Sequence, residues 1–358
     1  RNFEYFVPEN YPAEIEEHQT MGKQANFRPT RRELLKYSGA MAASTALASA
    51  LPGEATAFYR FGGESARLHP DRMQPSPAAK YGFNHLTFSD DFLSPDSIDV
   101  NNTLASGYKW YMANAMIPQD SPDGNLQTGV VQSPSSVSVA NSILTFVPSA
   151  KSGGWLTNVG YKGASDPRTA GTPIAATGGY FECRMSFDPS FKPAASFVYP
   201  FQYWPAFWIE DIDLWLAIND RNTARGNKPE LDFFEYFSRS VGYGMDMHDW
   251  TNNIHSAGLI PRVVNASLGS PAFERMNTFG TLWVPQRKNH GTGIVQRYFN
   301  GKHIAAADVT YSSTTTSPQA TGGFPGVFSD MDTSAGFVLQ IGSGHGWPVH
   351  VDYVRVWQ

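Results

Sequence analysis

Three carboxylates, Glu230, Asp232 and Glu235, interrupt the apolar, aromatic segment Pro229–Phe237. An apolar run enriched in aromatic residues predicts a buried or half-buried strand. Burying even one unpaired carboxylate costs several kcal/mol, so such a strand has no structural use for three of them. The acids must therefore face a wet groove, a metal or one another, which makes this segment the candidate functional site.

Strand geometry sets a condition on these acids. Alternate side chains of a strand share a face, so Glu230 and Asp232 point the same way. Glu235 joins them only if a β-bulge inserts one residue near Phe233 and Phe234. The outer Cα atoms would then lie about 13 Å apart. Two glutamates leaning inward across a concave sheet could approach to about 5–5.5 Å, the separation of a retaining glycosidase pair.

Two other interpretations of the acidic pattern stay open. Acids at this spacing also occur on exposed strands and in metal loops, and the triplet alone is only moderately specific. A calcium loop would carry Gly and Asn among its ligands, whereas apolar residues separate the acids here. The interleaving favours a strand that lines a groove.

The composition restricts the class of protein. With 358 residues, 41% of them hydrophobic and 14% aromatic, the chain can bury one large β domain or two ordinary ones. A formal net charge of −5, with no basic cluster in the body of the chain, argues against nucleic acid as a partner. The single cysteine, Cys183, excludes an internal disulfide framework and is expected to be a core residue.

Residues 1–57 are predicted to be an export signal region. The paired Arg31 and Arg32 precede a weakly apolar stretch, Tyr37–Leu51, and the small residues Ala55–Ala57. This order is typical of a twin-arginine-like signal, and the apolar stretch is too short and too polar to span a membrane. Met21 is the predicted start of translation, with residues 1–20 as upstream read-through.

The rest of the chain reads as a linker followed by a β domain. Residues 58–83 are rich in Pro, Gly and Arg and lack periodicity, which predicts a linker or irregular arm. Short strand-like runs follow, and we expect loops over 212–228 and 312–326. This pattern predicts an all-β antiparallel sandwich or barrel. The predicted strands include Leu86–Phe88, Ser136–Val139, Ile143–Val147, Tyr180–Phe187, Val295–Phe299, Phe337–Ile341 and Val349–Trp357.

The acidic segment resembles the signature of glycoside hydrolase family 16 in its bulged form, Glu-x-Asp-x-x-Glu. Other segments resemble strands of that family in the same order: Phe88–Phe92, Gly179–Met185, Trp204–Trp208, Asn253–His255, Phe279–Trp283, Tyr298–Lys302 and Val351–Trp357. The resemblance covers residues 84–358, one catalytic domain. It implies a concanavalin A-like jelly-roll sandwich of two antiparallel sheets with a concave substrate cleft.

The resemblance also implies roles for single residues. Glu230 corresponds to the nucleophile, Glu235 to the general acid/base, and Asp232 to the acid between them. Asp352 corresponds to a position that binds a structural calcium in several members, and catalysis requires no cofactor. The residues expected to contact substrate are Trp204, Trp208, His255, Gln340 and Trp347.

The function implied is that of an exported, retaining endo-β-glycanase that is periplasmic or extracellular and acts as a monomer on a polysaccharide. The bulged signature slightly favours β-1,3-glucan as the predicted substrate. The chain departs from the family near the cleft, at Gly342–Gly346 and in the long segment between Trp208 and Glu230 that contains Glu210. A transglycosylase and a glycan-binding protein without catalysis remain alternatives, and retention of all three acids argues against the second.

Overall fold

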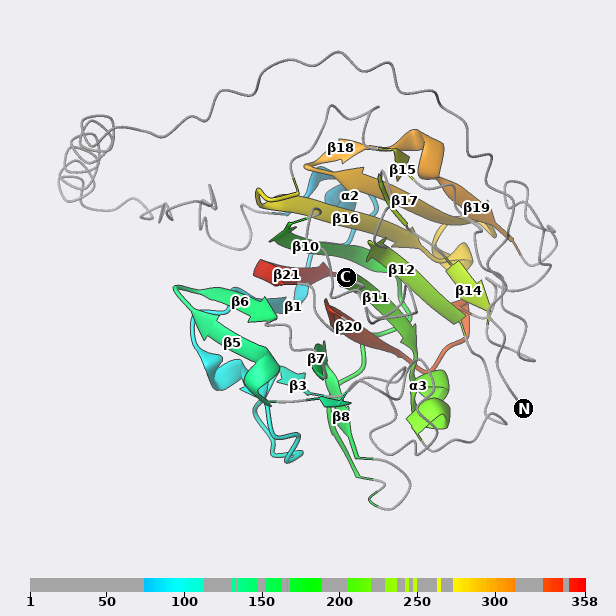
Figure 1. Ribbon diagram of the computed structural model, residues 1–358. Helices are drawn as coiled ribbons and strands as arrows, with labels where there is room; N and C mark the ends of the chain where they lie inside the picture. The colour runs from blue at the N-terminus through cyan, green and yellow to red at the C-terminus, as the bar shows by residue number, and fades with distance from the viewer. Residues whose placement is uncertain are drawn as a thin grey trace, which may run out of the picture. The chain divides into compact units, whose positions relative to one another are not determined.

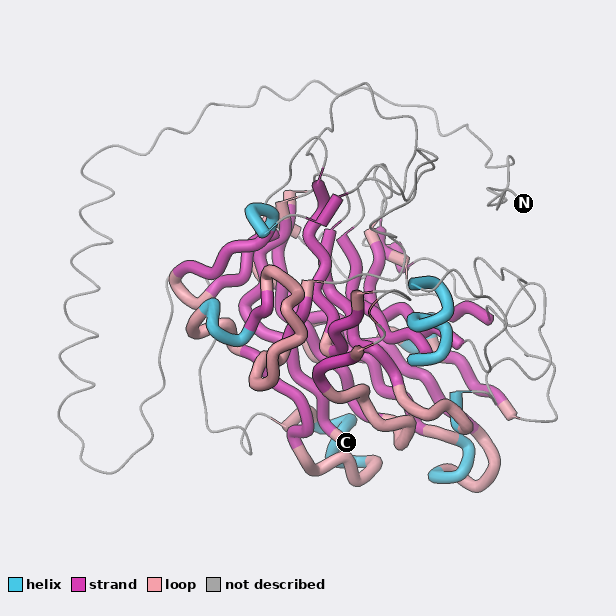
Figure 2. The backbone as a smooth tube through the Cα atoms, turned by 90° about the horizontal axis from the view of Figure 1, so that it is seen from below, coloured by secondary structure: helices cyan, strands magenta, loops and turns pink. Residues whose placement is uncertain are grey.

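Most of the described chain forms β-strands (Figure 2). The computed structural model describes residues 74–112, 131–132, 134–146, 152–162, 166, 168–188, 205–219, 229–236, 242–244, 247–249, 263–264, 273–312, 331–343 and 348–358. These residues belong to one compact unit that the chain forms after residue 69. The predicted signal region and the start at Met21 lie outside the described residues.

The first large sheet has nine strands among the described residues, and every pairing in it is antiparallel (Figure 1). Strand β1 also pairs with β21, and β19 pairs with β17. In sheet order the others are β18, β17, β16, β10, β21, β6 and β5. Their bounds are β1 (Leu86–Asp90), β5 (Val137–Ala140), β6 (Ile143–Phe146), β10 (Gly179–Phe187), β16 (Asn277–Val284), β17 (Gly293–Phe299), β18 (Lys302–His303), β19 (Val309–Tyr311) and β21 (Val349–Trp357).

The second large sheet has eight strands among the described residues, in the order β14, β12, β11, β20, β7, β3 and β2, with β4 beside β7. The β2–β3 and β4–β7 pairs are parallel, so this sheet is mixed rather than purely antiparallel. The bounds are β2 (Ile98–Asp99), β3 (Trp110–Tyr111), β4 (Val131–Gln132), β7 (Ser152–Thr157), β11 (Pro205–Asp211), β12 (Pro229–Glu235), β14 (Met247–Asp249) and β20 (Phe337–Ser343).

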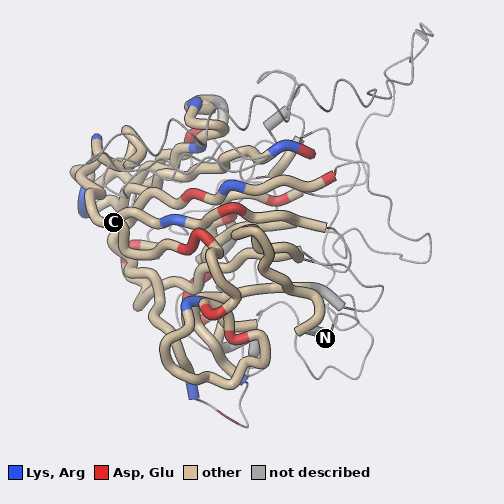
Figure 3. Tube along the Cα trace, turned by 90° about the vertical axis from the view of Figure 1, so that its left-hand side faces the viewer, with Lys and Arg blue, Asp and Glu red and all other residues tan. Residues whose placement is uncertain are grey.

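Short elements complete the described part. Two small sheets pair β8 (Val159–Tyr161) with β9 (Thr169–Gly171) and β13 (Gly242–Tyr243) with β15 (Val263–Val264). The α-helices are α2 (Ser76–Lys80) and α3 (Ile212–Asn219), and 3-10 turns span Pro95–Ser97, Pro134–Ser136, Gln286–Lys288 and Ala305–Ala307. No helix in the described ranges is long and apolar enough to cross a membrane. Figure 3 shows Lys and Arg interspersed with Asp and Glu along the described strands.

The all-β sandwich predicted from the sequence is confirmed, since each predicted strand run overlaps an observed strand. The prediction of a loop over 212–228 is wrong at its start, because helix α3 begins there and its Trp215 is buried. The described end of the segment predicted as a linker or irregular arm is packed, because α2 and the turn after it bury Ala78 and Phe83 against strands of the nine-stranded sheet.

The core between the two sheets is rich in stacked aromatic rings. Phe233 of β12 stacks on Phe181 of β10, in the other sheet, with ring centroids 4.6 Å apart. Phe233 also meets Phe207 of its own sheet edge to face at 4.9 Å. The lone Cys183 is buried in this same core, as predicted. The strand that carries the acids is therefore fixed from behind by aromatic contacts.

Replacing Phe233 with alanine tests this attachment. The side chain is 1% exposed, so its removal leaves a cavity in the core, and we expect the free energy of unfolding to fall by about 3–5 kcal/mol. Denaturant unfolding of the two proteins measures the difference. Leu93→Ala is the control, because Leu93 is 65% exposed and its truncation should change stability by no more than about 0.5 kcal/mol. Equal stability of the Phe233 variant and the wild type would contradict the packing described.

Candidate active site

Strand β12 contains the bulge that the sequence requires. On the neighbouring strand β11, Phe207 pairs with Phe234 and Trp208 pairs with Asp232, which leaves Phe233 without a register partner. Two residues of β12 thus oppose one of β11, the arrangement of a β-bulge. The prediction of a bulge between Asp232 and Glu235 is confirmed.

The bulge brings all three acids to the same face of the sheet. Residues directly opposite one another in an antiparallel pair share a face. Glu230 pairs with Glu210, Asp232 with Trp208, and Glu235 with Ala206. These β11 partners alternate with Phe207 and Ile209, which lie in the core. The acids therefore point away from the core between the sheets.

We call this surface the acid face, and the strand register defines its residues. From β12 to β20 the rows are Glu230–Glu210–Val338, Asp232–Trp208–Gln340 and Glu235–Ala206–Gly342. Strand β7 extends the last two rows with Thr157 and Trp155. Figure 1 shows β12, β11 and β20 side by side, with α3 at one end of them. The acid face thus consists of Glu230, Asp232, Glu235, Ala206, Trp208, Glu210, Val338, Gln340, Gly342, Trp155 and Thr157.

The three acids are buried. Glu230 is 3%, Asp232 0% and Glu235 4% exposed. Water screens charges at such positions much less than at the surface, so the protonation of each acid depends on the others.

Arg297 supports the bulge from within the core. It lies on β17 between the core residues Val295 and Phe299, and its side chain is fully buried. Its Nη2 donates to the carbonyl oxygen of Asp232 at 3.0 Å. A bulge disrupts the regular ladder, and a buried carbonyl there needs another donor. Arg297 thus ties the two sheets together at the bulge and places a positive charge behind the acids.

Two of the predicted substrate contacts, Trp208 and Gln340, lie on the acid face, and both side chains are buried. Trp208 packs edge to face on Trp155, with ring centroids 4.7 Å apart, and both indoles are buried. Gln340 is also buried, and its Nε2 donates to Oε1 of Glu210. Trp208 and Gln340 thus lie in the same row of the acid face as Asp232, and direct contact with sugar stays a prediction for both.

Glu210 is a fourth carboxyl on the acid face. It stands directly opposite Glu230 and is fully buried. Burial raises the pKa of Glu210 well above its ordinary value, and the neighbouring Glu230 charge raises it further, while the hydrogen bond from Gln340 acts in the other direction. The end of the site around Glu230 therefore favours a protonated carboxyl beside a charged one.

Gly342 allows the Trp155 indole to lie against the sheet. A Cβ atom at this position would collide with the Trp155 ring and with the carbonyl oxygen of Gly154. We expect Gly342→Ala to lower the free energy of unfolding by about 1–3 kcal/mol, the usual cost of overpacking. Denaturant unfolding measures the effect, and a variant with wild-type stability would show that Trp155 moves aside freely.

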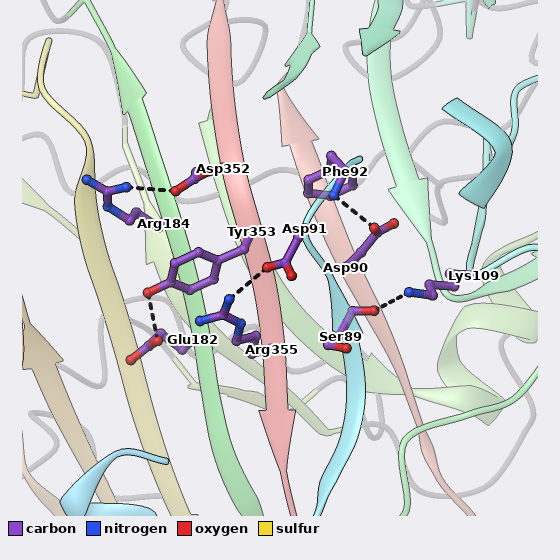
Figure 4. A network of polar contacts seen from close by, with 10 residues as sticks. All are labelled: Ser89, Asp90, Asp91, Phe92, Lys109, Glu182, Arg184, Asp352, Tyr353 and Arg355. Carbon is purple, nitrogen blue, oxygen red and sulfur yellow. Dashed lines mark hydrogen bonds and ion pairs between the residues drawn. The ribbon is translucent and has the colours of Figure 1, made fainter. Parts of the chain in front are cut away.

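Asp352, the predicted calcium ligand, lies on the outer side of the nine-stranded sheet in an ion pair. Its Oδ2 is 2.7 Å from Nη1 of Arg184 (Figure 4). In the register with β10, Arg184 pairs with Tyr353 and Met185 with Val351, which makes Asp352 the extra residue of a second bulge. Within the described ranges, no group of three or more His, Cys, Asp or Glu side chains is arranged to hold a metal ion. A structural calcium at Asp352 stays a prediction.

The same outer face carries a buried polar network beside Asp352 (Figure 4). The Tyr353 hydroxyl donates to Glu182 at 2.9 Å, and Arg355 donates to Asp91 at 2.7 Å. Burial raises the pKa of Glu182, although the Tyr353 hydrogen bond and the Arg355 charge oppose that shift. Glu182 is therefore a buried acid of this chain that is remote from the acid face.

The remaining predicted contacts, Trp204, His255 and Trp347, lie outside the described residues. Three other residues beside the acids, Glu210, Trp155 and Arg297, were not predicted from the sequence as part of the site. For two of them, the alternation of side chains along the strand indicated the face on which they lie. Glu210 continues the alternation of Trp204, Ala206 and Trp208, and Arg297 takes the core-facing parity of Val295 and Phe299. The position of Trp155 beside the acids could not be predicted from its own strand, because it depends on the pairing of β7 with β20.

Comparisons with known proteins find similarity in structure only. No protein-family model matches the chain, and no curated protein matches its sequence. Among solved structures, the chain is similar to an endo-1,3-beta-glucanase from Streptomyces sioyaensis, with 17% identity, 76% of this chain and 95% of that chain covered, and a TM-score of 0.48.

Two further structures are similar over the same share of this chain. A laminarinase catalytic domain from Thermotoga petrophila RKU-1, an endo-1,3-beta-glucanase, has 14% identity, a TM-score of 0.44 and 97% of its length covered. A GlcNAcα1-4Gal-releasing endo-β-galactosidase from Clostridium perfringens has 16% identity, a TM-score of 0.47 and 62% of its length covered. All three TM-scores are below 0.5, and the function of this chain therefore has to be inferred from its own acid face.

Proposed function

We propose that this chain is a retaining endo-β-glycanase that hydrolyses a β-linked polysaccharide by double displacement. The observation that carries the proposal is the bulge at Phe233, because it brings Glu230, Asp232 and Glu235 to one face of one strand. Burying several carboxyl groups side by side is costly, and catalysis is a reason to keep three of them together.

The reaction needs one charged and one protonated glutamate. Glu230 attacks the anomeric carbon and forms a glycosyl–enzyme ester, while Glu235 donates its proton to the departing glycosidic oxygen. Glu235 then accepts a proton from water as that water attacks the ester and releases Glu230. Asp232, between them, can hydrogen-bond Glu230 when protonated.

The surroundings of the two glutamates fit this division of roles. The row of Glu235 continues with Ala206, Gly342 and Trp155, which carry no charge. An apolar neighbourhood favours the neutral form of a carboxyl, as an acid catalyst requires. The row of Glu230 instead contains the polar Glu210, which can donate a hydrogen bond to a charged nucleophile.

The substrate class and the cellular location of the enzyme are part of the same proposal. β-1,3-Glucan is the first substrate to test, on the strength of the bulged acidic signature, with Trp204, Trp208, His255, Gln340 and Trp347 as contacts. Export by the twin-arginine-like region within residues 31–57 would bring the enzyme to polysaccharide outside the cytoplasm. We propose a monomer without a catalytic cofactor, with a structural calcium at Asp352.

A polysaccharide panel tests the proposal. The protein is incubated with β-1,3-glucan, mixed-linkage glucan, galactan and xyloglucan, and reducing ends, product lengths and the anomeric configuration of the first product are followed. We expect new reducing ends, oligosaccharides of intermediate length and a β-configured first product. Products longer than the substrate would indicate a transglycosylase, and binding without cleavage would contradict the proposal and indicate a glycan-binding protein.

A further inference from the structure

We propose that Glu210 is a positioning residue for the nucleophile: a neutral buried carboxyl, held by Gln340, that orients Glu230 and keeps the Glu210–Glu230 pair at a single negative charge. This inference rests on the proposed function and adds a residue that the acidic signature on β12 does not contain.

The register places the two carboxyls next to each other. Glu210 and Glu230 are direct partners in the β11–β12 ladder, and such partners have Cβ atoms about 4.5–5.5 Å apart. Both side chains project onto the acid face, so their carboxyl groups face the same space. Two glutamate side chains that start from paired positions on one face are long enough for a protonated carboxyl of one to donate to the charged carboxyl of the other.

Among the described residues, no cation is a cause of the pKa shift of Glu210. The charged neighbours that affect its pKa among the described residues are Glu230 and Asp211, both acidic. From β20, the partner of Glu210 is the apolar Val338, and Val338 packs in a cluster with Trp215 of α3. Asp211 is turned to other partners, since it accepts from the Ser334 hydroxyl at 2.6 Å and from the backbone N–H of Asp213 at 2.7 Å. An ionised Glu210 would therefore be buried beside like charges.

The hydrogen bonds of Glu210 indicate which of its two carboxyl oxygens can carry the proton. The Gln340 amide donates to Oε1, and the Oε2 atom has no hydrogen-bond partner among the described residues. Burial and the neighbouring Glu230 charge both raise the pKa of Glu210, which favours its protonated form. A proton on Oε2 can then be donated to the charged Glu230, which fixes the nucleophile and stabilises its charge.

This arrangement predicts how stability depends on pH. The folded-state pKa of Glu210 is raised, so its contribution is fully present below the unfolded-state pKa of about 4.3 and is lost as pH rises towards the folded-state pKa. Glu210→Gln removes this titration while keeping a neutral group of the same shape. We expect its melting temperature to exceed that of the wild type by at least about 2 °C at pH 8, and the two to converge at pH 4.

The kinetic test compares two substitutions on a glycan that the wild type cleaves. Glu210→Ala should lower kcat about 10- to 100-fold, with KM within about threefold of wild type, because the nucleophile is misplaced while sugar contacts remain. Glu210→Gln should restore kcat to within about threefold, because a neutral amide can take the place of a protonated carboxyl. Glu182→Gln, a buried acid on the outer side of the other sheet, is the control and should keep wild-type kcat.

Several outcomes would overturn the inference. Wild-type kcat in Glu210→Ala would show that the nucleophile needs no positioning by Glu210. Loss of activity in Glu210→Gln equal to that in the alanine variant would show that the charged form is needed. A Glu210→Gln melting temperature that follows the wild type from pH 4 to pH 8 would show that the carboxyl is not neutral, even if the alanine variant fails to fold.

A failure of the proposed function can be distinguished from a failure of this inference. If the wild type cleaves none of the glycans, the positioning role falls with the proposed function, while the melting temperatures of Glu210→Gln still decide whether the carboxyl is neutral.

Discussion

We expect that replacing Glu230 or Glu235 with glutamine will abolish the proposed hydrolysis and leave the fold intact. Glutamine matches glutamate in shape but can neither attack the anomeric carbon nor transfer a proton. The loss of general acid/base catalysis alone is expected to lower the rate by about 10²–10⁴-fold. Initial rates on the best substrate of the panel measure the effect. Because both positions are buried beside other acids, each variant should unfold at a temperature equal to or above that of the wild type.

The two variants can be distinguished by the leaving group. The phenolate of an aryl glycoside with an acidic phenol can leave without being protonated by an acid catalyst. Glu235→Gln should therefore still release phenol once per active site, whereas Glu230→Gln, which lacks the nucleophile, should not. Glu182→Gln is again the matched control, since that buried glutamate lies outside the acid face and should keep wild-type turnover. Wild-type rates in either acid variant would show that the assigned roles are wrong.

Changing the length of β12 by one residue gives the second large effect. Insertion of an alanine between Phe234 and Glu235 moves Glu235 by one position, to the parity of the core residues Phe207 and Ile209. We expect hydrolysis to fall about 10²–10⁴-fold, as for loss of the acid itself. Deletion of Phe233 instead removes the bulge and leaves a regular Glu-Leu-Asp-Phe-Glu alternation, in which all three acids still share one face.

The deletion variant is therefore the control for the insertion. It loses the Phe233 stack on Phe181 and should be less stable, but it should retain measurable hydrolysis. Circular dichroism and melting temperatures establish that both variants fold, and rates are compared well below the lower melting temperature. An insertion variant as active as the wild type, or a folded deletion variant as inactive as the insertion, would show that the side of the strand to which Glu235 points does not govern activity.

Arg297 explains how the bulge is maintained in this protein. An arginine in an apolar core is costly unless its donors are used, and Nη2 of Arg297 donates to the Asp232 carbonyl beside the bulge. The positive charge lies behind a strand with three acids, where it reduces the cost of a negative charge on the acid face. The attachment of β12 thus combines aromatic packing at Phe233 with one hydrogen bond from the opposite sheet.

Local pattern was sufficient for the strands and for the condition on the acids. Short strand-like runs indicated strands of both sheets, and the three-residue step from Asp232 to Glu235 required a bulge that the register contains. These features depend on a period of two along one segment, which the sequence records directly. The packing of Ala78 and Phe83 was missed because a single short helical turn carries no periodic signal.

The spacing of Glu230, Asp232 and Glu235 along one strand fixes the condition under which they share a face, namely a bulge between Asp232 and Glu235. The residues that surround the three acids depend instead on how the strands are arranged in the folded domain. Glu210 faces Glu230, Trp155 lies over Gly342 and Arg297 reaches the Asp232 carbonyl because strands far apart in the chain are neighbours in the sheets. Side-chain parity is a local property of a strand, whereas strand order and the partner across the core come from the packing of the whole domain.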